Sequence, residues 1–394
     1  MIFRTVSGYF DHNATTPVAP EVVEAVARAL SETYGNASSV HAYGQRAKAA
    51  LDDARGALAA LVGAEPAEVV FTGSGTESDN FALRGSVEAL SARGRRRVIT
   101  TAIEHEAVLN TARHLVKRGF ELTVLPVTSD GVVTVEGLRG AIGPDVALVS
   151  IMHANNEIGT IQPVAELAAV AHEHGALMHT DAVQSVGKIP VDVRTLGIDL
   201  LSLSGHKFYG PKGTGALWMR RSVRLAPLLT GGRHERNRRA GTENVPGLIG
   251  LGVAATLAAR SLAVESDRLS GLRDRLERQV LATVAGTIVN GVGAPRVPNT
   301  SNIGFTGVEA ESLLIALDLE GFAVSTGSAC SSGTLEPSHV LKAMHLPNGR
   351  AQNAIRFSLG AGNTAEDVDR LCAVLPGIVS KLRTLTRLPA GARP

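Results

Sequence analysis

The sequence has few cysteines, no excess of either charge and no apolar run of membrane-spanning length. Its 394 residues include only two cysteines, Cys330 and Cys372, so it has no disulfide framework and suits a reducing compartment. The 39 basic and 37 acidic residues nearly cancel, which argues against a dedicated nucleic-acid-binding protein. The longest apolar run without charge, residues 244–259, is too short to span a membrane, and residues 1–10 do not resemble a signal peptide. We therefore expect a soluble, cytoplasmic protein.

What the sequence does contain is a repeated alternation of short apolar runs and helical stretches. Strands are predicted at residues 68–72, 97–101, 122–125, 146–151, 177–179 and 200–203. Helices are predicted at residues 20–30, 47–61, 77–90, 106–117 and 164–174. This alternation is typical of an α/β domain with a mainly parallel sheet.

The C-terminal part of the sequence has a different pattern. A long, heavily charged helix is predicted from about residue 258 to 284, where it would connect two domains. A helix at residues 309–319, a strand at 355–358 and a final helix from about residue 364 follow, and they indicate a smaller α+β domain. We therefore predict a large domain over residues 16–258 and a small domain formed by residues 1–15 and 259–394.

Lys207 is the most informative single residue. It follows the apolar run 200–203 and lies in a glycine-rich loop, where a lysine has no packing role. A lysine so placed can form a Schiff base with a carbonyl cofactor, usually pyridoxal phosphate (PLP), provided that a carboxylate lies near for the ring nitrogen. Asp181 ends another predicted strand, close enough in sequence for a crossover to an adjacent strand end, and can supply that carboxylate. Taken alone, a lysine near glycines is usually a solvated loop residue, so this interpretation depends on its neighbours.

A glycine-rich turn lies between a predicted strand and a predicted helix at residues 72–79, which read TGSGTESD. The backbone N–H groups of Gly75 and Thr76, together with the helix dipole, would form a seat for a phosphate. The alternative is a capping box with Thr76 as the N-cap and Asp79 three residues on, in which the glycines only make the turn. The two roles are compatible, and Ser204 and His206 would add donors to a phosphate at this place.

Three further polar side chains follow predicted strands. His105 could stack on an aromatic ring and move protons, or it could simply lie near a helix N-terminus beside glutamates. Asn156 could bind a phenolic oxygen or close a turn. Gln184 would point into the same space as Asp181 if that segment is helical.

The two cysteines have contrasting surroundings. Cys330 lies among small polar residues in the segment 325–333, STGSACSSG, which suits an exposed and mobile nucleophile. An unperturbed thiol has a pKa of about 8.5 and is only slightly ionised at neutral pH, so full activity needs a nearby cation or proton acceptor. Cys372 lies at helical spacing among aliphatic residues and is predicted to be a core residue.

Two other patterns carry less weight. His172 and His174 are two residues apart, so on a helix they face different directions, and no metal site is predicted. The arginines of the segment 233–239 have no aromatic residue between them, so we favour an anionic small-molecule site over a nucleic-acid-binding patch.

Taken together, the motifs of this chain resemble those of the cysteine desulfurases. They are residues 11–17 (DHNATTP), 104–105 (EH), 154–159 (ANNEIG), 180–188 (TDAVQSVGK), 204–207 (SGHK), 239–244 (RAGTEN) and 327–330 (GSAC). The resemblance is to the nitrogen-fixation and housekeeping branch of this PLP-dependent family, within the class V aminotransferase superfamily, and it covers residues 10–382. It implies an aspartate-aminotransferase-type fold and a homodimer with active sites near the subunit interface. It also implies conversion of L-cysteine to L-alanine, with the sulfur left as a persulfide on Cys330.

The resemblance also implies roles for individual residues. Lys207, Cys330 and His105 would be catalytic, with Lys207 holding PLP and His105 stacked on its ring. Asp181 would pair with the pyridine nitrogen and Gln184 with the phenolic oxygen. The phosphate would be bound by Gly75, Thr76, Ser204, His206 and, from the partner subunit, Thr242. Asn156, near the cofactor, and Arg356 would bind the substrate, Arg356 through the substrate carboxylate.

This chain departs from the family pattern in two segments. The phosphate loop reads TGSGT where the family more often has TSGAT, and the cysteine segment has Thr326 and Ser331 where serine and threonine are commoner. Both departures keep the required backbone and size. The alternatives are a selenocysteine lyase or another class V PLP enzyme, which would not need Cys330 for its main reaction, and a non-enzymatic sulfur-assembly scaffold. The expected persulfide acceptor is a protein such as an iron–sulfur scaffold.

Overall fold

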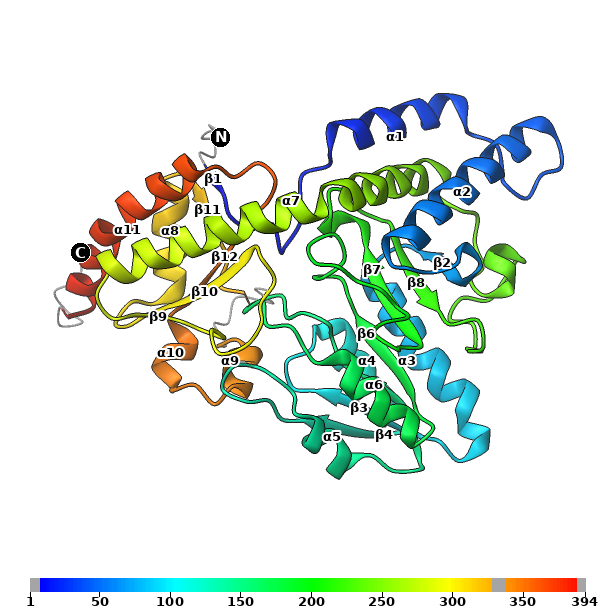
Figure 1. Cartoon of the computed structure of the whole chain (residues 1–394), viewed down its shortest axis with the longest axis horizontal. Coiled ribbons are helices and arrows are strands. Elements are labelled where there is room, and N and C mark those ends of the chain that lie inside the picture. The colour runs from blue at the N-terminus through cyan, green and yellow to red at the C-terminus, as the bar shows by residue number, and fades with distance from the viewer. Residues whose placement is uncertain (1–7, 328–336, 388–394) are drawn as a thin grey trace.

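The structure, a computed structural model, describes residues 8–327 and 337–387. Figure 1 shows two lobes joined by one long helix, α7 (Val245–Thr283), which runs across both of them. The larger lobe contains a seven-stranded sheet, and the smaller lobe contains a three-stranded sheet with helices packed against it.

The seven-stranded sheet is the scaffold of the large lobe. Its strands are β2 (Val69–Thr72), β3 (Arg97–Thr101), β4 (Glu121–Leu125), β5 (Val146–Ser150), β6 (Leu177–Asp181), β7 (Leu200–Ser204) and β8 (Gly215–Met219). They lie in the order β2-β8-β7-β6-β5-β3-β4, and all neighbours are parallel except β8, which is antiparallel to both β2 and β7. The predicted α/β class with a mainly parallel sheet is therefore confirmed, and β8 is an addition to the predicted strands.

Alternate residues of each strand face two different cores, because side chains of a strand alternate between the faces of its sheet. Val69 and Phe71 of β2 pack into a core with apolar residues of α2 (Ala42–Leu61), α6 (Val164–Glu173) and α7. Val70, between them, packs with α3 (Gly75–Leu90) and α4 (Glu106–Lys117) on the other face. Helices therefore cover both faces, as expected for strands that are apolar throughout. Two further helices, α1 (Pro20–Glu32) and α5 (Val135–Ala141), complete this lobe.

Helix α7 begins well before residue 258, where the sequence pattern predicts its start. Asn244 caps the helix, accepting a hydrogen bond from the N–H of Gly247 at 3.2 Å. The first turns are rich in glycine, which has low helix propensity, but α2 packs so closely that a Cβ on Gly252 would lie 2.6 Å from the Cα of Ala54. Tertiary packing against α1 and α2 thus overrides local propensity. By length and composition α7 could also cross a membrane. However, apolar residues of its N-terminal half, such as Leu248 and Leu251, are buried in the core of the large lobe.

The small lobe has its own core. Its elements are β1 (Gly8–Tyr9), β9 (Thr287–Val289), β10 (Thr300–Phe305), α8 (Ala310–Leu319), β11 (Phe322–Ala323), α9 (His339–Ala343), α10 (Asn348–Gln352), β12 (Ala354–Ser358) and α11 (Ala365–Arg387). Strands β10 and β12, helix α8 and helix α11 bury their apolar residues against the C-terminal half of α7. The predicted domain limit at residue 258 lies inside α7, and the division into domains stays a prediction.

Candidate active site

A cavity of about 370 Å³ lies between the carboxyl ends of β5, β6 and β7 and the edge of the small lobe. Ten of the twelve residues that the sequence predicts for the site line it: Gly75, Thr76, His105, Asn156, Asp181, Gln184, Ser204, His206, Lys207 and Arg356. The other two are Thr242, which lies elsewhere, and Cys330, which lies outside the described residues. Strand ends of an open α/β sheet are the place where such folds bind ligands.

Lys207 ends a short 3-10 turn, Gly205–Lys207, directly after β7. Its Nζ donates to two backbone carbonyl oxygens, of Asn13 at 2.6 Å and of Ala14 at 2.7 Å. Burial and then the nearby Arg356 cation lower the pKa of Lys207 to about 8. The cavity therefore contains an amine that loses its proton far more readily than an exposed lysine does.

Asp181 ends β6 and lies in the same cavity, where its Oδ1 accepts the N–H of Val183 at 2.9 Å. Burial raises the pKa of Asp181, and burial together with the Asp181 charge raises the pKa of Asp79 well above its usual range. Within the described part of the chain, Oδ1 of Asp79 has no hydrogen-bond partner. A protonated ring nitrogen beside Asp181 would add positive charge next to these two buried acids.

The N-terminus of α3 forms one end of the cavity. Its N-cap is Ser74, whose Oγ accepts the N–H of Glu77 at 3.1 Å, so the alternative with Thr76 as the cap is wrong. Capping by Ser74 leaves the N–H groups of Gly75 and Thr76 in the first turn, at the positive end of the helix dipole. A Cβ on Gly75 would lie 2.8 Å from Cγ2 of Val183, so glycine brings this helix end close to Val183 without displacing its side chain.

Ser204 and His206 face this helix end from β7 and the turn after it. Burial, followed by the charges of three nearby lysines, lowers the pKa of His206 to about 4, so its ring is neutral at physiological pH. Nδ1 of His206 lies 3.1 Å from Oγ1 of Thr15, which fixes the ring. Together with the α3 N-terminus, these groups form a site suited to a phosphate.

His105 lies both at a helix N-terminus, one of the two alternatives that the sequence left open, and in the wall of the cavity. It is the N-cap of α4, and its Nδ1 accepts the N–H of Ala107 at 3.1 Å. With Nδ1 accepting this bond, Nε2 is the ring nitrogen left to donate a hydrogen bond. The ring is exposed and lines the cavity, so it is available to contact a flat ligand.

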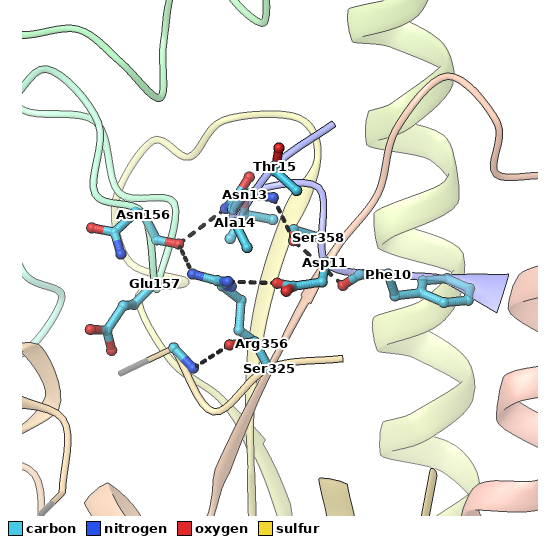
Figure 2. A network of polar contacts seen from close by, with 12 residues as sticks. Phe10, Asp11, Asn13, Ala14, Thr15, Asn156, Glu157, Ser325, Arg356 and Ser358 are labelled. Atoms are coloured by element: carbon cyan, nitrogen blue, oxygen red, sulfur yellow. Dashed lines mark hydrogen bonds and ion pairs between the residues drawn. The ribbon is translucent and has the colours of Figure 1, made fainter. Parts of the chain in front are cut away.

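Arg356, on β12, also lines the cavity, and Figure 2 shows its polar contacts. One terminal nitrogen, Nη2, pairs with Oδ1 of Asp11 at 2.6 Å, and the other, Nη1, donates to the carbonyl oxygen of Asn156 at 3.0 Å. Nε is buried and has no partner among the described residues. This guanidinium is therefore held in place in the cavity wall, and the second N–H groups of its terminal nitrogens remain for an incoming carboxylate.

Arg356 also borders the segment that carries Cys330. Backbone hydrogen bonds join Arg356 and Ser325 in both directions, at 2.7 and 3.2 Å, so residue 325 lies beside the arginine (Figure 2). Beyond the undescribed residues 328–336, Oγ of Ser338 donates to the buried carboxylate of Glu157 at 2.5 Å. Both ends of the segment thus lie near Glu157, since a Cβ on Gly327 would lie 2.8 Å from Oε2 of the same glutamate.

Cys372, in contrast, is a core residue, as predicted. It lies on α11 in the small-lobe core, and burial raises the pKa of its thiol to about 12. A thiol with this pKa is almost entirely protonated at neutral pH and is a poor nucleophile.

Thr242 is exposed and lies on the connection between a 3-10 turn, His234–Asn237, and α7. Before it, Glu235 accepts a bidentate ion pair from Arg55, with both distances at 2.7 Å, and Arg239 pairs with Glu77 of α3 at 2.8 Å. Arg236 and Arg238 donate to the carbonyl oxygen of Ala67. Three of the arginines in this segment therefore make contacts within the chain.

Sequence reasoning missed two buried residues, Asn13 in the wall of the cavity and Lys188, which contacts it. Asn13 is fully buried, and its backbone and side chain contact Lys207, Gln184, Asn156 and Lys188. Lys188 is also buried, and its Nζ reaches the side chains of Gln184 and Asn13. Both occur in motifs that carried the resemblance, but their separation in sequence gave no sign that they meet.

Comparisons with known proteins show what this chain is similar to. A model of the family described as aminotransferase class-V matches residues 8–371. The chain is 50% identical to "Cysteine desulfurase IscS" of Dictyoglomus turgidum over 378 residues, 96% of each chain. It is 52% identical to "Cysteine desulfurase" of Gluconacetobacter diazotrophicus over 386 residues, 98% of this chain and 96% of that one.

Solved structures give the same result. A "NifS-like protein" superposes with a TM-score of 0.89 at 38% identity, covering 95% of this chain and all of that one. The structure titled "SspA in complex with cysteine" has a TM-score of 0.80 at 35% identity, covering 90% of this chain and 99% of that one.

Proposed function

Since this chain belongs to the class-V aminotransferase family, and relatives named cysteine desulfurase are 50% and 52% identical to it, we propose that it is a PLP-dependent cysteine desulfurase. Its fold is the predicted aspartate-aminotransferase-type fold of PLP enzymes. The observation that carries the proposal is the meeting, in one cavity, of a low-pKa lysine, two buried acids, a helix N-terminus and an arginine with an open donor.

The residues of the cavity fit PLP. Nζ of Lys207 would hold the cofactor covalently, and Asp181 would pair with its ring nitrogen, supported by the unpartnered oxygen of Asp79 behind it. Gln184 would contact the phenolic oxygen and His105 the face of the ring. The phosphate would be bound by Gly75, Thr76, Ser204 and His206. When bound, PLP makes the Cα hydrogen of an amino acid acidic by accepting electrons into its ring.

The chain itself binds the substrate and moves its protons. Arg356 would bind the carboxylate of L-cysteine with the second N–H groups of its terminal nitrogens, and Asn156 would contact the same amino acid. Lys207, whose pKa is about 8, would take the Cα proton at Nζ, and the carbonyl oxygens of Asn13 and Ala14 hold that ammonium group afterwards.

We assign the sulfur-transfer step to Cys330. Its thiolate would attack the sulfur of the substrate, forming a sulfur–sulfur bond while the carbon–sulfur bond breaks. The electron pair of the broken bond goes to the substrate carbon, which is protonated and leaves as L-alanine. The sulfur remains on Cys330 as a persulfide and is then passed to an acceptor. Cys330 lies outside the described part of the structure. The support for this role is therefore the sequence around Cys330, in which small polar residues surround the thiol.

A selenocysteine lyase or another class V PLP enzyme is the second candidate, and Cys330 distinguishes it. Purified protein given L-cysteine and a reductant should form alanine and sulfide in equal amounts, and Cys330→Ser should lose sulfide formation. Cys372→Ser is the matched control, because that thiol is buried away from the cavity and should keep full activity. Undiminished sulfide formation by Cys330→Ser would exclude Cys330 as the nucleophile.

We further propose a homodimer, in which Thr242 of the partner subunit contacts the phosphate. This is consistent with the exposed position of Thr242 in a segment fixed to α3 by the Arg239–Glu77 pair. We also propose a cytoplasmic location and a protein acceptor such as an iron–sulfur scaffold. A pull-down scored by transfer of labelled persulfide would identify the acceptor.

A further inference from the structure

Lys188 is a buried lysine without an acidic partner. Its side chain belongs to a residue that is 9% exposed, and the described part of the chain gives its Nζ no carboxylate to pair with. Burial, and then the charges of Lys207 and Arg356, lower the pKa of Lys188 well below its usual range. Burying an amine without an acidic partner costs free energy, and this cost indicates that Lys188 has a role in positioning the groups that it contacts.

Both contacts of Lys188 are the oxygens of side-chain amides. Its Nζ lies 2.5 Å from Oε1 of Gln184 and 2.8 Å from Oδ1 of Asn13. Because a lysine donates to these oxygens, each amide must turn its NH₂ group the other way. Lys188 thus helps to fix the orientation of both amides, together with the Asn13 carbonyl oxygen that accepts from Gln184 and with Asn299, whose Nδ2 donates to Oδ1 of Asn13 at 3.0 Å.

The orientation of Gln184 matters for the cavity. With Oε1 bound to Lys188, its Nε2 donates to the backbone oxygen of Asn13 at 2.9 Å and keeps a second hydrogen. Gln184 lines the cavity, so that second hydrogen can be offered to a ligand there. The same Asn13 oxygen accepts from Nζ of Lys207, which places the amide beside the amine.

The Asn13 amide leads to the substrate side. Its Nδ2 donates to the carbonyl oxygen of Asn156 at 3.1 Å and to Oγ1 of Thr300 at 2.8 Å. The Asn156 oxygen also accepts from Arg356, as Figure 2 shows. One lysine therefore supports both the cofactor side and the substrate side of the cavity through oriented amides.

We propose that Lys188 is a positioning residue, which holds the Gln184 amide so that its N–H group, rather than its oxygen, faces the phenolic oxygen of the cofactor. This inference rests on the proposed PLP function. A donor at the phenolic oxygen stabilises the cofactor after it has lost the proton that this oxygen shares with the imine nitrogen. Without Lys188 the Gln184 oxygen loses the donor that holds it, so the amide is held less firmly by its remaining bond to the Asn13 carbonyl oxygen, and the cofactor should keep that proton to higher pH.

The test is a pH titration of the visible absorption of the purified holoenzyme. Lys188→Met removes the donors but keeps the aliphatic stem, and it should raise the midpoint by about one pH unit, the size expected for a weakened hydrogen bond to a charged group. Gln184→Ala should raise the midpoint similarly, and the double variant should show no further increase. Lys188→Arg, which keeps donors, should stay near the wild type, as should the exposed control Lys117→Met.

Each other outcome has a distinct meaning. A lower melting temperature with an unchanged midpoint would make Lys188 purely structural and overturn the inference. An equal rise when Lys188→Met is added to Gln184→Ala would show a direct effect of charge and also overturn it. If the wild type has no visible absorption with PLP, the proposed function itself fails. Should Lys188→Met be insoluble, Lys188→Gln, which cannot reach both oxygens, carries the same expectation.

Discussion

Replacing Arg356 by lysine should specifically weaken recognition of the substrate carboxylate. In the structure the guanidinium uses one N–H of Nη2 for Asp11 and one of Nη1 for Asn156, and the second N–H of each nitrogen remains for a ligand. A lysine ammonium cannot reach both partners and still present a directed donor to a carboxylate. Hydrogen bonds between charged groups contribute about 1.5–3 kcal/mol, and about 1.4 kcal/mol corresponds to a factor of ten in affinity.

We therefore expect the KM for L-cysteine to rise by about 10- to 100-fold in Arg356→Lys, with a smaller change in kcat. The assay is alanine formation against cysteine concentration, beside the binding of cysteamine, which has no carboxylate and should bind both proteins alike. The control is Arg350→Lys, because Arg350 donates to Asn290 outside the cavity. An unchanged KM, or an equal loss of affinity for cysteamine, would refute the assignment of Arg356 to the carboxylate.

Three further predictions concern the lysine, the phosphate seat and stability. In cofactor-free protein, the rate of acylation of Lys207 should rise with pH with a midpoint near 8, because only the unprotonated amine reacts and its pKa is about 8. Peptide mapping measures this rate. A midpoint near the pKa of exposed lysines, about 10.4, would contradict the prediction. His206→Ala should lower PLP affinity by about tenfold or more, since it removes a donor to the phosphate and a hydrogen bond to a charged group contributes about 1.5–3 kcal/mol. Fluorescence titration measures the affinity, and wild-type affinity would count against the phosphate seat. Gly56 lies in α2, where an added Cβ would meet nothing within 4 Å. Gly56→Ala should therefore raise the free energy of unfolding by about 0.4–1 kcal/mol, because alanine lowers the conformational entropy of the unfolded chain. Urea unfolding measures this change, and a decrease would contradict the packing around Gly56.

Strands and helices with strong local patterns could be predicted from the sequence. The buried run of β7 and the amphipathic α4 lie where their periodicity places them. The early start of α7 could not be predicted, because its glycine-rich first turns have poor helix propensity and form a helix only against α2. The capping-box alternative read from the sequence has Thr76 as the N-cap of α3, whereas the structure has Ser74. Serine and threonine can both cap a helix, so only the backbone conformation distinguishes them.

The candidate site likewise contains residues that the sequence could predict and residues that it could not. Lys207, Asp181 and Gly75 stand at strand ends or strand-to-helix turns, where a sequence pattern points to a ligand. The roles of Asn13 and Lys188 come from contacts between segments far apart in the chain, and the unpartnered oxygen of Asp79 is visible only once burial is known. Such features depend on tertiary packing, which a local motif does not contain.

The most direct test of the central claim is to find where the sulfur goes. Holoenzyme treated with ³⁴S-labelled L-cysteine without reductant, then digested and analysed by mass spectrometry, should carry the label as a persulfide on Cys330 and none on the buried Cys372. Label on neither cysteine while alanine and sulfide are released, or label retained at full level in Cys330→Ser, would contradict the account.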